Sequence, residues 1–127
     1  ADAAIKANLA NIRAQAEMLY DSYGGYGVDL TPTAFSEAAC TNVGTGADTL
    51  FADPKIVAQI TAAGNASSGG GLGAGRCVST VGANAAYAVS VPLKTVPTDA
   101  WCVDSSGASV KVAAGDLGIT AATCVPN

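Results

Sequence analysis

The chain has 127 residues, a length that favours a single domain with a thin core. Its net charge is −4 and its six Lys and Arg are spread singly, so no basic patch is present to bind nucleic-acid phosphates. Charged residues make up only 13% and the mean hydropathy is positive, which argues against a disordered chain.

The first element that we predict is a long helix over residues 1–23. Alanine and other good helix formers fill this stretch, and two glycines at 24–25 are typical of a helix C-terminus. Large apolar residues recur at the i, i+3, i+4, i+7 spacing of one helix face. We expect this face to pack in the core, and its members are Ile5, Leu9, Ile12, Ala16, Leu19, Tyr20 and Tyr23.

The other side of this helix is also non-polar, which is unusual for a helix on a protein surface. A surface helix normally carries its charges opposite the core face. Here small residues and one methionine lie there, between two polar flanks, and we call Ala3, Ala7, Ala10, Ala14 and Met18 the alanine face. Two explanations stay open: exposed alanines that serve helix propensity alone, or a face on which further helices pack closely.

The middle of the chain predicts a connector with one short helix. Residues 26–52 are rich in turn formers, and a helix is expected over 52–64 with Asp53 as N-cap, Pro54 at its first position and Gly64 at its end. Residues 65–75, "NASSGGGLGAG", predict a flexible surface loop. The triplet at 65–67 also matches the acceptor pattern for N-glycosylation, a short match that arises often by chance.

The second half of the chain changes to β patterns. Strands are predicted over 76–81 and 86–93, followed by a hairpin over 100–113 around "DSSG" and an irregular tail over 115–127. The order of elements predicts an α+β fold in which one long N-terminal helix packs on one face of an antiparallel sheet.

The four cysteines indicate disulfides and an oxidising compartment. They are spaced widely and the chain has no His, so a structural zinc site is not expected. Four cysteines allow three pairings, and sequence alone does not choose among them. We expect the pairing of sequence neighbours, which joins Cys40 to Cys77 and Cys102 to Cys124, and each bridge would contribute about 3–4 kcal/mol in the chain-entropy view.

Catalytic, metal and cofactor sites have little support. Without His, neither a Ser-His nor a Cys-His nucleophile can form, so we expect no enzyme and no cofactor. The glycines at 69–75 precede a strand rather than a helix, which disfavours a phosphate cradle. Calcium ligands could come from Asp48 with Asp53, or from Asp104 with Asp116, although no EF-hand spacing is present.

The segment "DAAIKANLANIRAQAEMLYDSYGGYG" resembles the part of the first helix that follows the membrane-spanning half in type IV pilins and pseudopilins. "WCVDSSG" and "CTNVGTGADTLFADPKIVAQITAAG" are similar to bacterial pilin sequences too. The hydrophobic N-terminal segment of the family, its cleavage site and its near-terminal Glu are absent. We therefore expect the chain to be a processed or trimmed product that contacts a membrane only through that absent segment.

The resemblance implies one pilin-like domain over 1–127. Residues 1–24 would be the C-terminal half of the spine helix, 25–75 a connector, and 76–127 an antiparallel sheet with a C-terminal disulfide loop, for which Cys102 and Cys124 are suitably placed. The expected function is a structural subunit of a type IV pilus-like filament for adhesion, motility or uptake. The subunit would be anchored in the inner membrane before assembly and displayed outside the cell afterwards.

The same resemblance implies the partners: copies of the same chain, which meet through the alanine face, and the pilus assembly machinery. Two alternatives stay open. One is a minor pilin or a type II secretion pseudopilin, which a calcium ion near Asp104 or Asp116 would favour. The other is a secreted, disulfide-stabilised binding module that uses residues 65–75, which a ligand-sized pocket would favour.

Overall fold

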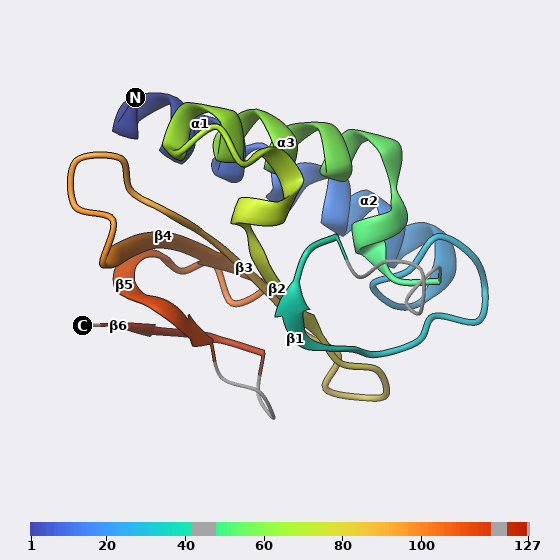
Figure 1. Ribbon diagram of the computed structural model, residues 1–127. Helices are drawn as coiled ribbons and strands as arrows, with labels where there is room; N and C mark the ends of the chain where they lie inside the picture. The colour runs from blue at the N-terminus through green and yellow to red at the C-terminus, as the bar shows by residue number, and fades with distance from the viewer. Residues whose placement is uncertain (42–47, 118–121, 127) are drawn as a thin grey trace.

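The computed structural model describes residues 1–41, 48–117 and 122–126, with the backbone alone for 115–117 (Figure 1). The fold is α+β, as expected: helices cover one face of an antiparallel sheet. The strands of this sheet lie in chain order, and each pairs with the next. They are β1 Phe35–Ala39, β2 Arg76–Ser79, β3 Tyr87–Pro92, β4 Asp99–Asp104, β5 Ser109–Leu117 and β6 Cys124–Pro126.

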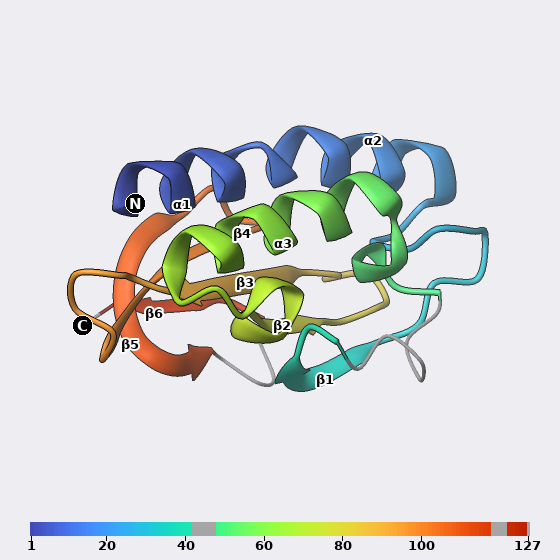
Figure 2. The same cartoon turned by 45° about the horizontal axis from the view of Figure 1, so that its top comes forward.

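The N-terminal helix forms where predicted, in two parts with one shared direction (Figure 2). Part α1 is Asp2–Ala10 and part α2 is Ile12–Tyr23. Asn11 between them keeps right-handed helical angles (φ −73°, ψ −16°), so the chain continues with little change of course. Gly24 ends the helix with φ 74°, a left-handed conformation that favours glycine, and its N–H donates to the carbonyl of Tyr20 at 2.8 Å.

A second helix lies beside the first on the same face of the sheet, so the expectation of a single covering helix is wrong (Figure 2). This helix, α3, is Pro54–Ser67. The carboxylate of Asp53 accepts hydrogen bonds from the N–H groups of Lys55 and Ile56, at 3.1 and 3.2 Å, which confirms the predicted N-cap and the position of Pro54.

The predicted end of α3 at Gly64 is also wrong, because the helix continues for three more residues. Gly64 is buried, and a Cβ there would lie 1.8 Å from the carbonyl oxygen of Gly71. The glycine therefore serves a close approach of two backbones inside the helix, and not the helix end. The N–H of Gly69, which has φ 81°, donates to the carbonyl of Gly64 instead and closes the helix there.

Four further elements occur where turns, loops or an irregular tail were expected. Strand β1 lies in the turn-rich connector, short 3-10 helices span Leu50–Ala52 (η2) and Gly71–Ala74 (η3), and β6 lies in the tail. Residues 65–75 are therefore largely structured, because their first part completes α3 and their glycines turn back as η3 against it.

The main core lies between the helices and the sheet. The N-terminal helix contributes Ile5, Leu9 and Ile12, α3 contributes Ile56 and Ile60, and all five are fully buried. From the sheet and connector come Tyr26, Phe35, Leu50, Phe51, Tyr87, Val89, Val91 and Val103, together with the Cys40–Cys77 disulfide.

A smaller apolar cluster lies on the other face of the sheet. Its strand members alternate with the main-core residues, since successive side chains of a strand point to opposite faces. The cluster contains Val78, Ala88, Ala100, Cys102, Val112, Ala122 and Cys124. The Cys102–Cys124 disulfide joins β4 to β6 within this cluster. Both disulfides match the pairing of sequence neighbours that was expected.

Candidate functional site: the exposed face of the N-terminal helix

The predicted core face of the N-terminal helix packs against the sheet and α3. Ile5, Leu9, Ile12 and Ala16 are fully buried, and Leu19 is nearly so. Tyr23, the last residue of α2, is only half-buried and packs against the margin of the core. The core face therefore forms as predicted from Ile5 to Leu19 and weakens at its C-terminal end.

The alanine face is open to solvent over its whole length. Ala3, Ala7, Ala10 and Ala14 are all exposed, and the side chain of Met18 is 51% exposed. None of these residues belongs to either apolar cluster of the described chain. The helix thus has one face that stabilises the domain and a second apolar face that the domain does not use.

Sequence reasoning missed a charged residue on this second face. At ~100° per residue, Asp21 lies at about the same angle as Ala3 and Ala14, so it extends the alanine face towards its C-terminal end. The structure leaves Asp21 exposed. A helical projection carried on to Asp21 places this carboxylate on the alanine face, so the sequence contains the signal.

Three contacts hold the N-terminal helix in place beside this face. The carboxylate of Asp2 accepts hydrogen bonds from the N–H groups of Lys94 and Thr95 and from the Thr95 hydroxyl. The hydroxyl contributes most to lowering the pKa of Asp2, while the backbone groups add to it. The ammonium of Lys6 lies 4.5 Å from the ring centre of Trp101, a cation–π contact.

The third contact joins the two helices. The side-chain amide of Gln15 donates to Oδ1 of Asp53 at 3.3 Å, on the carboxylate that also caps α3. Together these contacts fix the helix from its start to its middle. The alanine face therefore lies on a helix that side-chain contacts attach to the sheet and to α3.

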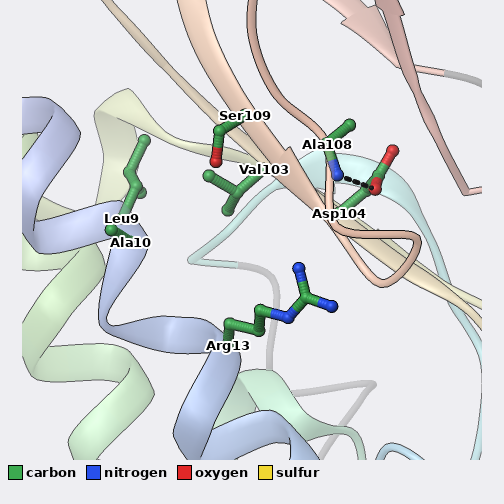
Figure 3. A pocket seen from close by; sticks show the side chains of 7 residues that line it. All are labelled: Leu9, Ala10, Arg13, Val103, Asp104, Ala108 and Ser109. Carbon is green, nitrogen blue, oxygen red and sulfur yellow. Dashed lines mark hydrogen bonds between the residues drawn. The ribbon is translucent and has the colours of Figure 1, made fainter.

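A pocket of about 210 Å³ lies at one border of the alanine face, between the N-terminal helix and the turn after β4 (Figure 3). Arg13 lines it from the helix, and the guanidinium extends towards the turn. A Cβ on Gly107 would lie 2.6 Å from the nearer guanidinium nitrogen, so the guanidinium rests directly on the backbone of the turn. The remaining lining residues are Leu9, Ala10, Val103, Asp104, Ala108 and Ser109.

The candidate calcium ligands have other roles or lie outside the described residues. Asp104 is 3% exposed, and its carboxylate accepts four hydrogen bonds from the turn and the tail. Asp53 caps α3, and the hydrogen bond and negative charge of Asp29 raise the pKa of Asp48. The Asp116 side chain is outside the described residues, and within them no three Asp, Glu, Cys or His side chains gather as metal ligands.

The structure also bears on the glycine-rich segment and its glycosylation pattern. Asn65 lies in α3, and the hydroxyl of Ser67 is buried and donates to the carbonyl of Pro92 at 2.6 Å, so the acceptor triplet is locked in a helix. A second pocket, of about 430 Å³, includes Ser67 and Ser68 of this segment, and its other walls are Pro92, Leu93, Lys94 and Pro97.

Comparison of the chain with family models, with curated proteins and with solved structures found no match. Within the described ranges, no helix combines the length and apolar character that crossing a membrane requires.

Proposed function

We propose that this chain is a structural subunit of a type IV pilus-like filament, displayed outside the cell for adhesion, motility or uptake. The observation that carries the proposal is the exposure of the alanine face on a helix whose opposite face forms the core. Small side chains allow helix backbones to approach closely, so this face suits packing against helices of neighbouring subunits.

Three further observations support the same function. An N-terminal helix on an antiparallel sheet is compatible with a pilin-like fold. The disulfide between Cys102 and Cys124 closes the C-terminal region, and two disulfides fit an oxidising environment outside the cytoplasm. The segments quoted above for their similarity to pilins include the whole of the N-terminal helix.

The partners that this function implies are further copies of the chain and the machinery that assembles them. A minor pilin or a type II secretion pseudopilin would use the same face in the same way. Calcium binding by the purified protein would favour the pseudopilin alternative. The pocket of about 430 Å³ at Ser67 and Ser68 favours the third alternative, a secreted binding module. Such a module would leave the alanine face without a role, so filament assays separate it from both pilin alternatives.

The test compares two alanine-to-glutamate variants of the full-length subunit in cells that produce it. Ala14 lies on the alanine face, whereas Ala62 is exposed on a different helix, α3. Ala14→Glu should abolish filaments that an antibody against this protein labels, because a charge in a packed helix interface lacks water and a partner. Ala62→Glu should leave filament number unchanged.

Thermal melts of the 127-residue chain provide the control for folding. Both variants should melt within a few degrees of the wild type, since both side chains point to solvent. Labelled filaments at wild-type number in Ala14→Glu would contradict the proposed use of this face. Absence of the protein from any filament in wild-type cells would contradict the proposed function itself.

A further inference from the structure

The guanidinium of Arg13 lies against a turn of the backbone but has no acceptor among the described residues. It rests on the backbone of Gly107. Arg13 lines the pocket beside the alanine face (Figure 3). Glu17 lies one helical turn away, the usual distance for an ion pair on a helix, yet the two side chains form none. Arginine presents five donors in a fixed fork that fits a carboxylate, so the pocket offers a site for a carboxylate from outside this chain.

The alanine face carries a carboxylate, Asp21, that would need a cation if the face were buried. Asp21 is exposed and makes no ion pair or hydrogen bond within the described part of the chain. If further helices pack on the alanine face, Asp21 loses its water. An unpaired carboxylate in such an interface is costly, so a packed arrangement requires a cation from the neighbouring molecule.

We propose that Asp21 of one copy of this chain binds Arg13 of the next copy at this pocket. This inference rests on the proposed function and adds the specific contact that pairs the subunits. Lys6 is the other cation on the N-terminal helix, but it is engaged with Trp101. Arg13 is therefore the cation beside the alanine face that has no ion-pair or hydrogen-bond partner among the described residues.

The charges also select how the two helices are oriented. In an antiparallel pair, Arg13 of each copy would contact Asp21 of the other. Glu17 lies halfway between these two residues, so the Glu17 carboxylates of the two copies would face each other, which is unfavourable. A parallel pair offset by eight residues, about 12 Å along the axis, avoids this repulsion. Such a head-to-tail contact does not close on itself, so it extends into a filament.

A charge exchange tests the pair in cells that produce the full-length subunit. Arg13→Asp and Asp21→Arg should each reduce the number of labelled filaments about tenfold or more, and the double exchange should restore it to within about twofold of wild type. Lys55→Asp is the control, because it changes the charge as Arg13→Asp does but at an exposed site on α3. Each purified variant should melt as the wild type does.

Cross-linking of intact filaments tests the orientation. Subunits that carry Glu17→Cys keep both charges of the pair, and intact filaments are exposed to mild oxidation. The parallel offset of about 12 Å holds the two introduced thiols too far apart to bridge, so subunits should run as monomers on a non-reducing gel, whereas a disulfide-linked dimer would overturn the parallel arrangement. If wild-type filaments contain the protein but single exchanges leave their number unchanged, the inference fails and the proposed function stands. If no filament contains the protein, both fail.

Discussion

The carboxylate of Asp104 binds the backbone N–H of Cys124 at 2.8 Å and thereby joins the end of β4 to a residue twenty positions later. Its other oxygen accepts from the N–H groups of Ser106 and Ala108 and from the Ser106 hydroxyl, at 2.6–3.1 Å. One buried side chain thus shapes the turn after β4 and positions the tail next to the Cys102–Cys124 disulfide. This turn is also the one on which Arg13 rests.

Asp104→Ala should therefore lower the free energy of unfolding much more than the loss of a single hydrogen bond would. Several buried donors would lose their acceptor, so we expect a decrease of about 2–4 kcal/mol in the free energy of unfolding, measured in denaturant with both disulfides intact. Amide hydrogen exchange at Cys124 should become faster. Asp21→Asn, which changes an exposed carboxylate, should alter stability by less than about 0.5 kcal/mol. An unchanged exchange rate at Cys124 in the Ala variant would refute the role of Asp104 in holding the tail.

Gly64→Ala should reverse the usual effect of this substitution in a helix. Alanine inside a helix normally stabilises by about 1 kcal/mol relative to glycine. At Gly64 the new Cβ would overlap the backbone of Gly71, so we expect a net loss of about 1–3 kcal/mol instead. Gly73→Ala is the matched control, because a Cβ there meets only an ordinary contact with Thr41. A stabilised Gly64→Ala variant in thermal melts would show that η3 moves away freely.

Local sequence patterns predicted both main helices, the central strands and the disulfide pairing. The helix over 2–23 follows from its apolar spacing and its terminal glycines, and Asp53 with Pro54 marked the start of α3. The central strands also formed, with ends shifted by a few residues, except that β5 continues to residue 117. Sequence proximity led to the correct disulfide pairing.

The features that sequence reasoning missed depend on distant partners. Gly64 is a common helix-ending residue, and only the approach of Gly71 shows that it serves packing. Strand β1 has weak alternation and exists through its pairing with β2, as in Phe35 opposite Ser79. The pocket at Arg13 requires the turn at Gly107, 94 residues away, so no local pattern could have indicated it.

The two faces of the N-terminal helix should respond oppositely to substitution in the isolated chain. Leu9 is fully buried, so Leu9→Ala should lower the free energy of unfolding by about 2–5 kcal/mol. Ala7→Gln places a longer polar side chain on the exposed alanine face and should change it by less than about 0.5 kcal/mol. Urea denaturation of both variants measures the difference. A large loss for Ala7→Gln would mean that the alanine face is already packed within one molecule.

The buried hydroxyl of Tyr87 leads to a prediction about alkaline stability. Tyr87 is fully buried, its ring lies 4.9 Å from that of Tyr26, and its hydroxyl has no hydrogen-bond partner among the described residues. Burial is the main cause that raises the pKa of Tyr87 above its usual value near 10, and the neighbouring Tyr26 and Glu17 add to it. Burial likewise raises the pKa of Tyr26. The folded state thus favours the protonated phenols more strongly than the unfolded state does.

Stability from these phenols is therefore fully present below about pH 10, the unfolded pKa, and is lost as the pH rises towards the higher folded pKa values. Tyr87→Phe removes the titrating hydroxyl without changing the ring, so the variant should retain more of its stability at pH 11 than the wild type. At pH 7 it should be as stable as the wild type or up to about 1–2 kcal/mol more stable, because a buried hydroxyl without a partner is unfavourable.

Denaturant unfolding of the wild type and of Tyr87→Phe at pH 7 and pH 11 measures the two effects. A clear loss of stability at pH 7 would mean that the hydroxyl is hydrogen-bonded in solution, and an unchanged pH dependence would assign the alkaline transition to other groups.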